Sequence, residues 1–309
     1  MSDKMNDTAK KLLKLIMDTA ENFKGAYNIR QDGQCVSQVS SRNIEIVQKK
    51  DKPGINVIIK PGTKGETVYI PACVTRGGVD DLVYNDFFVG EDSDVLIVAG
   101  CGVHTDDSGE ARHSGIHSFV VGENAHVRYV EKHIGTGSGS GTRSIDPVTA
   151  VTLEKNSYME MDMTQISGVS KTVRKTSAEV AEGARLVVRE RLFTEAEQHA
   201  ETFFDVALNG EGSGADIVSR SVAKDRSYQS YVSTIAGNAP CTGHTECDSI
   251  IDGEAVVDAS PRLLAHNKDA SLIHEAAIGK IAGEQILKLR TLGLTEEEAE
   301  KKIIEGFLA

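Results

Sequence analysis

Residue types that bind metals occur at close spacing near the C-terminal end of the sequence. Cys241, His244 and Cys247 are three residues apart, and His274 and Glu275 stand side by side further on. Thiolate and imidazole groups are ligands for zinc and iron, so this segment is a candidate metal site. A closed zinc site usually has a second Cys or His pair, which is missing here, so ordinary partly buried thiols are the competing interpretation.

A second group of candidate ligands begins at Cys101 and includes five of the nine histidines, which are His104, His113, His117, His126 and His133. Ligands on strands need side chains on one face, and these positions mix odd and even numbers, which favours hydrogen-bonded or solvated histidines. A metal-dependent enzyme of the β-solenoid or cupin type is the alternative for this segment. The glycine after Cys101 predicts an accessible thiol able to handle sulfur, whereas Cys35 and Cys73 are interpreted as plain thiols.

Nucleotide binding and hydrolase chemistry find no support in the sequence. The stretch GTGSGSGTRS, residues 135–144, lacks the Gly-Lys-Ser/Thr ending of a Walker loop and does not complete G-x-G-x-x-G. It is interpreted as a flexible surface loop. No G-x-S-x-G nucleophile motif is present either. We therefore expect that this chain binds no nucleotide itself.

The overall composition narrows the class of protein. The net charge is −12 and no basic stripe is present, which argues against a nucleic-acid partner. No run approaches the roughly 18 apolar residues that cross a membrane, and the first residues do not resemble a secretory signal. Five scattered cysteines do not form a disulfide framework, so we expect a cytoplasmic protein.

The elements that must position these residues are mostly short strands. Residues 1–26 contain an amphipathic helix from about Asp7 to Lys24. Residues 27–272 show strand-like runs, which include NVIIK (56–60), VLIVAG (95–100), HVRYVEKHI (126–134), YMEMDM (158–163) and ARLVVRERL (184–192). With no tryptophan and 29 glycines, the core must consist of small and β-branched residues. These features favour a β-solenoid over a β-sandwich.

A weak internal repeat supports stacked coils. A Gly and acidic turn, then a small residue, then a β-branched run recurs, with the small residue at Ser93, Ala125, Ala184, Ala215, Ala255 and Ala270. A solenoid coil cannot bury its apolar face alone, so neighbouring coils stack on it. A small inward residue at each turn would allow that stacking.

The last segment, residues 273–309, is predicted to be helical. One helix runs from Gly279 to Leu292 and ends before Gly293, the residue expected at C′. Thr295 and Glu298 predict a capping box at the start of the next helix. The apolar stripe of that last helix either packs back on the solenoid end or docks a partner protein, and the spacing alone favours neither.

The stretch from Thr245 to Phe307 resembles the SufB/SufD family of iron–sulfur cluster assembly proteins. The shared features are CDS (247–249), HEA (274–276), a GKI-x-x-x-Q helix (279–285), the turn GLTEEEA (293–299) and the closing IIEGF (303–307). Several separate motifs in the same order make the resemblance specific. It is strong over about 60 residues, and the His-rich segment has no counterpart that the sequence identifies.

The resemblance implies a right-handed parallel β-helix with a helical C-terminal subdomain. It also implies a scaffold without catalytic turnover, on which a transient iron–sulfur cluster is assembled and passed to apo iron–sulfur proteins. Cys247 corresponds to the cysteine that SufB uses, and Glu275 to the acidic residue that assists it. His274 is the neighbour of Glu275, and His244 is a further candidate ligand.

The same resemblance implies two protein partners. The C-terminal helices would dock a SufC-like ABC ATPase, with Gly279, Gln285, Leu294, Ala299, Ile303 and Phe307 as candidate contacts. The chain would pair with itself or with a SufB/SufD-like paralogue, and the cluster would lie at the subunit interface. The chain is shorter than typical SufB members, which fits a homodimer. A SufD-like structural subunit without cluster ligation is the alternative within the family.

Overall fold

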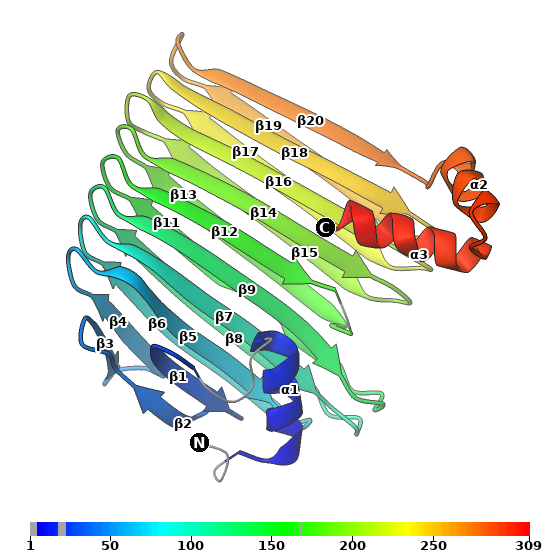
Figure 1. Cartoon of the computed structure of the whole chain (residues 1–309), viewed down its shortest axis with the longest axis horizontal. Helices are drawn as coiled ribbons and strands as arrows, with labels where there is room; N and C mark the ends of the chain where they lie inside the picture. Colours follow the sequence, from blue (N-terminus) through cyan, green and yellow to red (C-terminus); the bar gives the residue numbers. More distant parts are fainter. Residues whose placement is uncertain (1–4, 18–22, 167) are drawn as a thin grey trace.

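The computed structural model describes residues 5–17, 23–166 and 168–309. Within these residues, two long sheets lie face to face and enclose the core (Figure 1). Sheet A contains, in spatial order, β2 (Gln34–Val39), β1 (Ala26–Gln31), β5 (Lys64–Val74), β7 (Asp94–His104), β9 (His126–Thr136), β12 (Tyr158–Gln165), β14 (Arg185–Thr194), β16 (Ser213–Ala223), β18 (Cys241–Ile251) and β20 (Ser271–Gly279).

Sheet B contains the strands that alternate with these along the chain. They are β3 (Ile44–Gln48), β4 (Gly54–Ile59), β6 (Val79–Val89), β8 (Ala111–Val121), β10 (Arg143–Ile145), β11 (Val148–Leu153), β13 (Lys171–Val180), β15 (His199–Leu208), β17 (Tyr228–Gly237) and β19 (Val256–Ala265). From β4 onward the neighbours in each sheet are parallel, so the chain winds through a β-solenoid of about eight turns. The predicted mainly-β solenoid is confirmed.

Alternating side chains fill the space between the sheets. In β12, Met159, Met161 and Met163 are fully buried while the charged residues between them face outward. Every strand that the sequence singled out lies in one of the two sheets. The core between the sheets is therefore made of rows of side chains stacked about 4.8 Å apart, and it contains the aromatic residues Phe87, Phe119 and Tyr129 in addition to the small and aliphatic residues that the sequence predicted.

A row of small residues lies at the turn that precedes each sheet A strand. Strand register aligns its members, which are Thr63, Ser93, Ala125, Ser157, Ala184, Ser213, Cys241 and Ala270. The first seven are buried. Larger side chains at this position would keep neighbouring turns apart, so the row explains the small residue in the sequence repeat.

One of the predicted anchors is wrong, because Ala215 lies two residues inside β16, where Ser213 takes the equivalent position. Ala255 does precede a strand, but that strand is β19 of the other sheet, and Cys241 is the member of the row before β18. Cys241 thus has a structural place in the turn row, where a small inward residue is required.

Helix α1 (Asp7–Met17) lies on the outer face of sheet A over β5, β7 and β9 (Figure 1). The predicted helix extended to Lys24, and its residues 18–22 lie outside the described part of the chain. Gly102 of β7 lets the helix approach closely, because a Cβ there would lie 3.0 Å from two side-chain carbons of Leu12.

The C-terminal segment forms α2 (Gly283–Thr291) and α3 (Glu296–Phe307). The first begins four residues later than predicted, because β20 continues to Gly279. Gly293 has a positive φ of 97° after the end of α2, as expected for C′. Thr295 and Glu298 form the predicted capping box of α3.

Helix α3 packs on the outer face of sheet A. Ala299 is fully buried, and Glu300 forms an ion pair with Lys224 at 2.7 Å. By contrast, α2 has no buried residue, and Leu287 and Leu292 are 62% and 73% exposed. The last helix therefore packs on the outer face of sheet A and not on the solenoid end, whereas α2 presents exposed apolar side chains.

The C-terminal end of the solenoid is formed by β19 and β20, whereas β2 and β3 are the edge strands at the other end. Each of these strands pairs with a neighbour in its own sheet on one side only. Val256 and Ile273 in this last coil are each 53% exposed, and Ile278 is 43% exposed. No helix among the described residues is long and apolar enough to span a membrane.

Candidate functional site: the last two strands of sheet A

The candidate ligands lie on β18 and β20, which are hydrogen-bonded neighbours. Glu246 is the register partner of Glu275, and Cys247 is the partner of Ala276. Because consecutive side chains on a strand point to opposite faces, Cys247 and Glu275 lie on opposite sides of sheet A. Cys247 faces the interior and is 2% exposed, whereas Glu275 faces outward with a side chain that is 67% exposed.

The four predicted ligands therefore form two pairs. His274 is the register partner of the buried Thr245, so it shares the inner side of the sheet with Cys247. His244 shares the outer side with Glu275, and their atoms Nε2 and Oε2 are 3.5 Å apart. The structure brings His244 and Glu275 together, and it places both on the opposite side of sheet A from Cys247 and His274.

The inner pair lies near the C-terminal end of the solenoid. Burial raises the pKa of Cys247 to about 11, in spite of a hydrogen bond with Ser249. The ring of His274 donates from Nδ1 to the Thr245 carbonyl at 3.1 Å. Cys247 is thus a protonated thiol in this state, and it becomes a ligand only when a metal or a structural change removes its proton.

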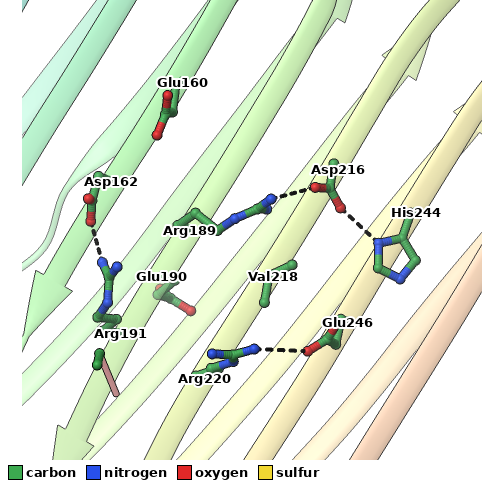
Figure 2. A pocket seen from close by; sticks show the side chains of 11 residues that line it. Glu160, Asp162, Arg189, Glu190, Arg191, Asp216, Val218, Arg220, His244 and Glu246 are labelled. Atoms are coloured by element: carbon green, nitrogen blue, oxygen red, sulfur yellow. Dashed lines mark hydrogen bonds and ion pairs between the residues drawn. The ribbon is translucent and has the colours of Figure 1, made fainter. Parts of the chain in front are cut away.

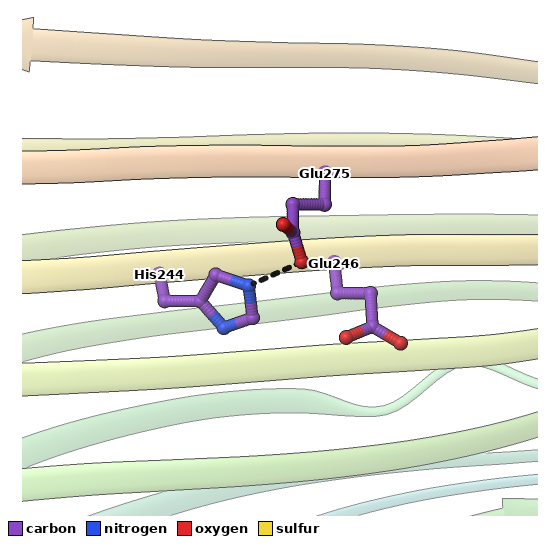
Figure 3. Close-up of side chains that lie close together, drawn as sticks. All are labelled: His244, Glu246 and Glu275. Atoms are coloured by element: carbon purple, nitrogen blue, oxygen red, sulfur yellow. Dashed lines mark ion pairs between the residues drawn. The ribbon is translucent and has the colours of Figure 1, made fainter.

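The outer pair belongs to a larger polar cluster. His244 donates from Nδ1 to Asp216 at 2.7 Å, and Arg189 binds the same carboxylate at 2.6 Å. The hydrogen bond to Asp216 raises the pKa of His244. The ligand atoms of His244, Glu246 and Glu275 all lie within 4.8 Å of one another (Figure 3).

A charged groove extends from this cluster across the outer face of sheet A. Ion pairs link Arg191 to Asp162, Arg189 to Asp216 and Arg220 to Glu246, so basic and acidic side chains alternate from strand to strand (Figure 2). The lining residues are Glu160, Asp162, Arg189, Glu190, Arg191, Asp216, Val218, Arg220, His244, Glu246 and Ala309. The groove therefore reaches the last residue of the chain.

A column of buried polar residues runs through the interior of the solenoid, and the sequence did not reveal it as a unit. Its members are Arg30, Asp81, Cys101, His113, Tyr129, Glu131, His133, Arg174, Glu190 and Ser219. The register partner of Ser219 is Cys247, so the column ends at the inner pair. The sequence signal that could have revealed this column is the presence of charged residues, such as Glu131 and Glu190, at strand positions whose side chains point inward.

Cys101 belongs to this column, and the prediction that it is accessible is wrong. Cys101 is only 5% exposed, and Gly102, which follows it, faces α1 on the other side of the sheet. Burial alone would raise the pKa of Cys101, but the charges and hydrogen bonds of His113 and His133 lower it from 9.0 to about 7. It is therefore a buried thiol with strong thiolate character.

The histidines of the His-rich segment lie on both faces of their strands, because some have odd and some have even residue numbers. Odd-numbered His113, His117 and His133 point inward and are buried, whereas His104 and His126 point outward. Hydrogen bonds hold the inner ones and also His104, in agreement with the prediction. Among the described residues, none of these histidines belongs to a group with metal-binding geometry.

The candidate contacts for a docking partner differ in accessibility. Gly279 and Gln285 are exposed, and Leu294, Ile303 and Phe307 are partly buried. Ala299 is fully buried, so it cannot touch a partner in this state. Between α3 and sheet A lies an apolar groove lined in part by Ile166, Phe193, Ile304 and Leu308.

Comparison with known proteins identifies the family. Residues 85–307 match the family described as SUF system FeS cluster assembly, SufBD core domain. The match includes the His-rich segment, which the sequence motifs alone did not connect to the family. The chain belongs to the SufBD family.

Individual relatives agree with this assignment. An iron-sulfur cluster assembly SufBD family protein of Methanothermobacter thermautotrophicus is 30% identical over 256 residues, which cover 81% of this chain and 61% of the relative. A SufBD family protein of Archaeoglobus fulgidus is also 30% identical, over 84% of this chain and 69% of its own length. The iron-sulfur cluster assembly protein SufB of Bacillus subtilis is 28% identical, over 71% and 47%. The chain thus spans less than two thirds of the first and third of these relatives.

Proposed function

From membership in the SufBD family, we propose that this chain is a scaffold subunit for iron–sulfur cluster assembly. In this proposal the protein acts in the cytoplasm and performs no catalysis of its own. It works with a SufC-like ABC ATPase and passes a transient cluster to apo iron–sulfur proteins. The nascent cluster is the cargo. Cys247 and Glu275 bind it at an interface between two subunits, and His274 and His244 assist.

The position of these residues supports the proposal. All four lie on β18 and β20, the last two strands of sheet A, beside the end of the solenoid that β19 and β20 leave open. Edge strands offer unpaired N–H and C=O groups and readily pair with another chain. A second copy, or a SufB/SufD-like paralogue, placed there would bring two sets of ligands together across a two-fold axis.

The chemistry of the residues suits a site that must release its product. A thiolate binds iron strongly, whereas a carboxylate is a harder and more exchangeable ligand. One thiolate and one carboxylate per subunit cannot enclose a cluster as four thiolates do. Because Cys247 is buried and its pKa is about 11, assembly requires a change that exposes the thiol, such as movement of the last coil driven by the ATPase.

The C-terminal helices support the proposed ATPase partner. Helix α2 has no buried residue and presents Leu287, which is 62% exposed, while α3, which contacts α2, is linked to the solenoid by the ion pair between Glu300 and Lys224. A docked partner on α2 could therefore transmit movement to sheet A through α3. The contact set would include Gln285, with Gly279 beside it.

Anaerobic reconstitution with ferrous iron and sulfide tests the cluster site. We expect Cys247→Ala to lose the visible cluster absorption, because the thiolate ligand is gone. Cys241→Ala is the matched control, since this second buried cysteine of β18 belongs to the turn row, and it should retain the absorption. A full cluster spectrum in Cys247→Ala would contradict the proposed ligand.

A SufD-like structural subunit without a cluster is the second candidate function. The buried, protonated Cys247 is the observation that favours it. In that case the wild-type chain would bind the ATPase but acquire no cluster, alone or in the complex.

A further inference from the structure

Three potential metal ligands, His244, Glu246 and Glu275, lie close together on the outer face of sheet A. His244 and Glu246 are two residues apart on β18, so they point the same way, and Glu275 of β20 is the register partner of Glu246. Their nitrogen and carboxylate oxygen atoms lie within 4.8 Å of one another (Figure 3). One imidazole and two carboxylates from adjacent strands thus face a common point.

The orientation of His244 is set by a second carboxylate behind it. Nδ1 donates to Asp216 at 2.7 Å, which leaves Nε2 directed at Glu275. Asp216 in turn accepts a hydrogen bond from Arg189 at 2.6 Å (Figure 2). In metal sites a ligating histidine commonly donates its other N–H to a carboxylate, which fixes the tautomer and the ring direction.

The spacing suits a small divalent ion. Two ligand atoms bonded to one ion at about 2.1 Å can be at most about 4.2 Å apart. The 3.5 Å between Nε2 of His244 and Oε2 of Glu275 meets this limit, and it is longer than a strong charge-assisted hydrogen bond of about 2.7–2.9 Å. The two remaining distances both involve Glu246 and need a shift of less than about 1 Å, which rotation of the Glu246 and Glu275 side chains, 21% and 67% exposed, can make.

The charges also suit such an ion. A neutral imidazole with two carboxylates carries a charge that one divalent cation neutralises. Arg220 is 3.9 Å from Glu246, too far for a hydrogen bond, and Glu275 is paired with His244. A mixed nitrogen and oxygen ligand set favours a divalent first-row transition ion over calcium or magnesium.

We propose that His244, Glu246 and Glu275 bind a single divalent transition-metal ion on the outer face of sheet A, with Asp216 as the positioning residue. The ion is ferrous iron if the scaffold function proposed above is correct, so that identity rests on the proposed function. The site is separate from the thiol, since Cys247 faces the other side of the same strand.

Titration of the full chain with Co²⁺, followed by visible absorption and calorimetry, tests the site. We expect one Co²⁺ per chain, without a thiolate-to-cobalt charge-transfer band. His244→Ala and Glu246→Gln should each weaken binding at least tenfold. Asp216→Asn should weaken it by about 10–100-fold and alter the cobalt spectrum while the thermal unfolding midpoint stays the same. Anaerobic Fe²⁺ should compete for the same site.

Two control variants distinguish the proposed ion site from nonspecific binding in the charged groove and from cluster binding at Cys247. Glu160→Gln removes an acidic side chain from the same groove but not from the cluster, and should leave Co²⁺ affinity unchanged. Cys247→Ala should also retain Co²⁺, even where it loses the reconstituted cluster. The proposal is overturned by a thiolate band, by equal loss in Glu160→Gln, or by unchanged affinity in His244→Ala and Glu246→Gln. A failure of cluster reconstitution alone counts against the scaffold function and leaves the ion site intact.

Discussion

Arg174 lies inside the solenoid between two buried carboxylates. It contacts Glu131 at 2.5 Å and Glu190 at 3.5 Å, and all three side chains are at most 5% exposed. Burial would raise the pKa of Glu131, but the charges of His133 and Arg174 outweigh it and hold that pKa well below its usual value. Each of these buried groups is therefore stabilised in its charged form by the oppositely charged groups beside it.

We expect Arg174→Met to destabilise the protein strongly. Removing one partner of a buried ion pair costs about 3–5 kcal/mol, because the remaining charge is left without compensation. Urea unfolding at pH 7 measures the change. Arg226→Met is the control, since the Arg226–Glu197 pair is exposed and should contribute nothing measurable. Equal unfolding midpoints for the two variants would contradict the role of the buried pair.

Cys101 provides a test of electrostatics in the same column. Its pKa of about 7 in the folded chain is below the reference value of 9.0. A group with a depressed pKa contributes stability in full above the unfolded value, and that stability is lost as pH falls through the folded value. The Cys101 contribution is therefore complete above about pH 9 and declines as the pH drops through about 7.

Ultraviolet absorbance of the thiolate checks this prediction. The wild-type spectrum minus that of Cys101→Ala should show a titration step near pH 7. The same difference for Cys247→Ala should show no step there, because the pKa of Cys247 is about 11. A Cys101 step at or above pH 9 would mean that the two histidines do not stabilise the thiolate.

At the scale of elements, the two C-terminal helices divide their tasks. Helix α3 is linked to the solenoid by the ion pair between Glu300 and Lys224, whereas α2 presents Leu287, which is 62% exposed. The capping box of α3 and the glycine after α2 were readable from the sequence because capping is local. The start of α2 was not, because pairing with β18 extends β20 to Gly279.

We expect Leu287→Asp to weaken binding of a SufC-like ATPase by about tenfold or more, because an exposed apolar side chain at the centre of a docking surface is replaced by a charge. Calorimetric titration of the purified ATPase measures the effect. Leu15→Asp on α1 is the matched control, since Leu15 is a 45% exposed leucine on a helix near the other end of the chain. Equal affinity for both variants would exclude α2 as the docking element.

For the whole molecule, the last coil, formed by β19 and β20, is the surface that bears on association with a second chain. The chain of 33.2 kDa ends its solenoid with two edge strands and with Ile278 43% exposed on the inner side of β20. A second copy would continue the stack and cover this residue. Exposed edges of this kind otherwise favour aggregation.

We therefore expect light scattering to give the mass of a dimer for the wild-type chain and of a monomer for Ile278→Lys, because the buried interface would have to accept a charge. Leu82→Lys is the control with similar exposure, 41%, in β6, remote from the C-terminal end of the solenoid. Dimers in both variants would place the contact elsewhere.

The class of fold, the helices at both ends and the family were readable from the amino-acid sequence. These follow from local patterns, since alternation, capping residues and ordered motifs such as HEA and IIEGF lie within a few residues of one another. The sequence also indicated Cys247 and Glu275 as a pair, through the resemblance.

The face of sheet A on which Cys247 and Glu275 each lie depends on long-range strand pairing, which the sequence did not reveal. The register of β18 against β20 pairs Glu246 with Glu275, and a shift by one residue would reverse every side chain. Such long-range register also assembles the buried column around Cys101 from strands far apart in sequence. Strand pairing between coils is a non-local choice, and no pattern within one coil contains it.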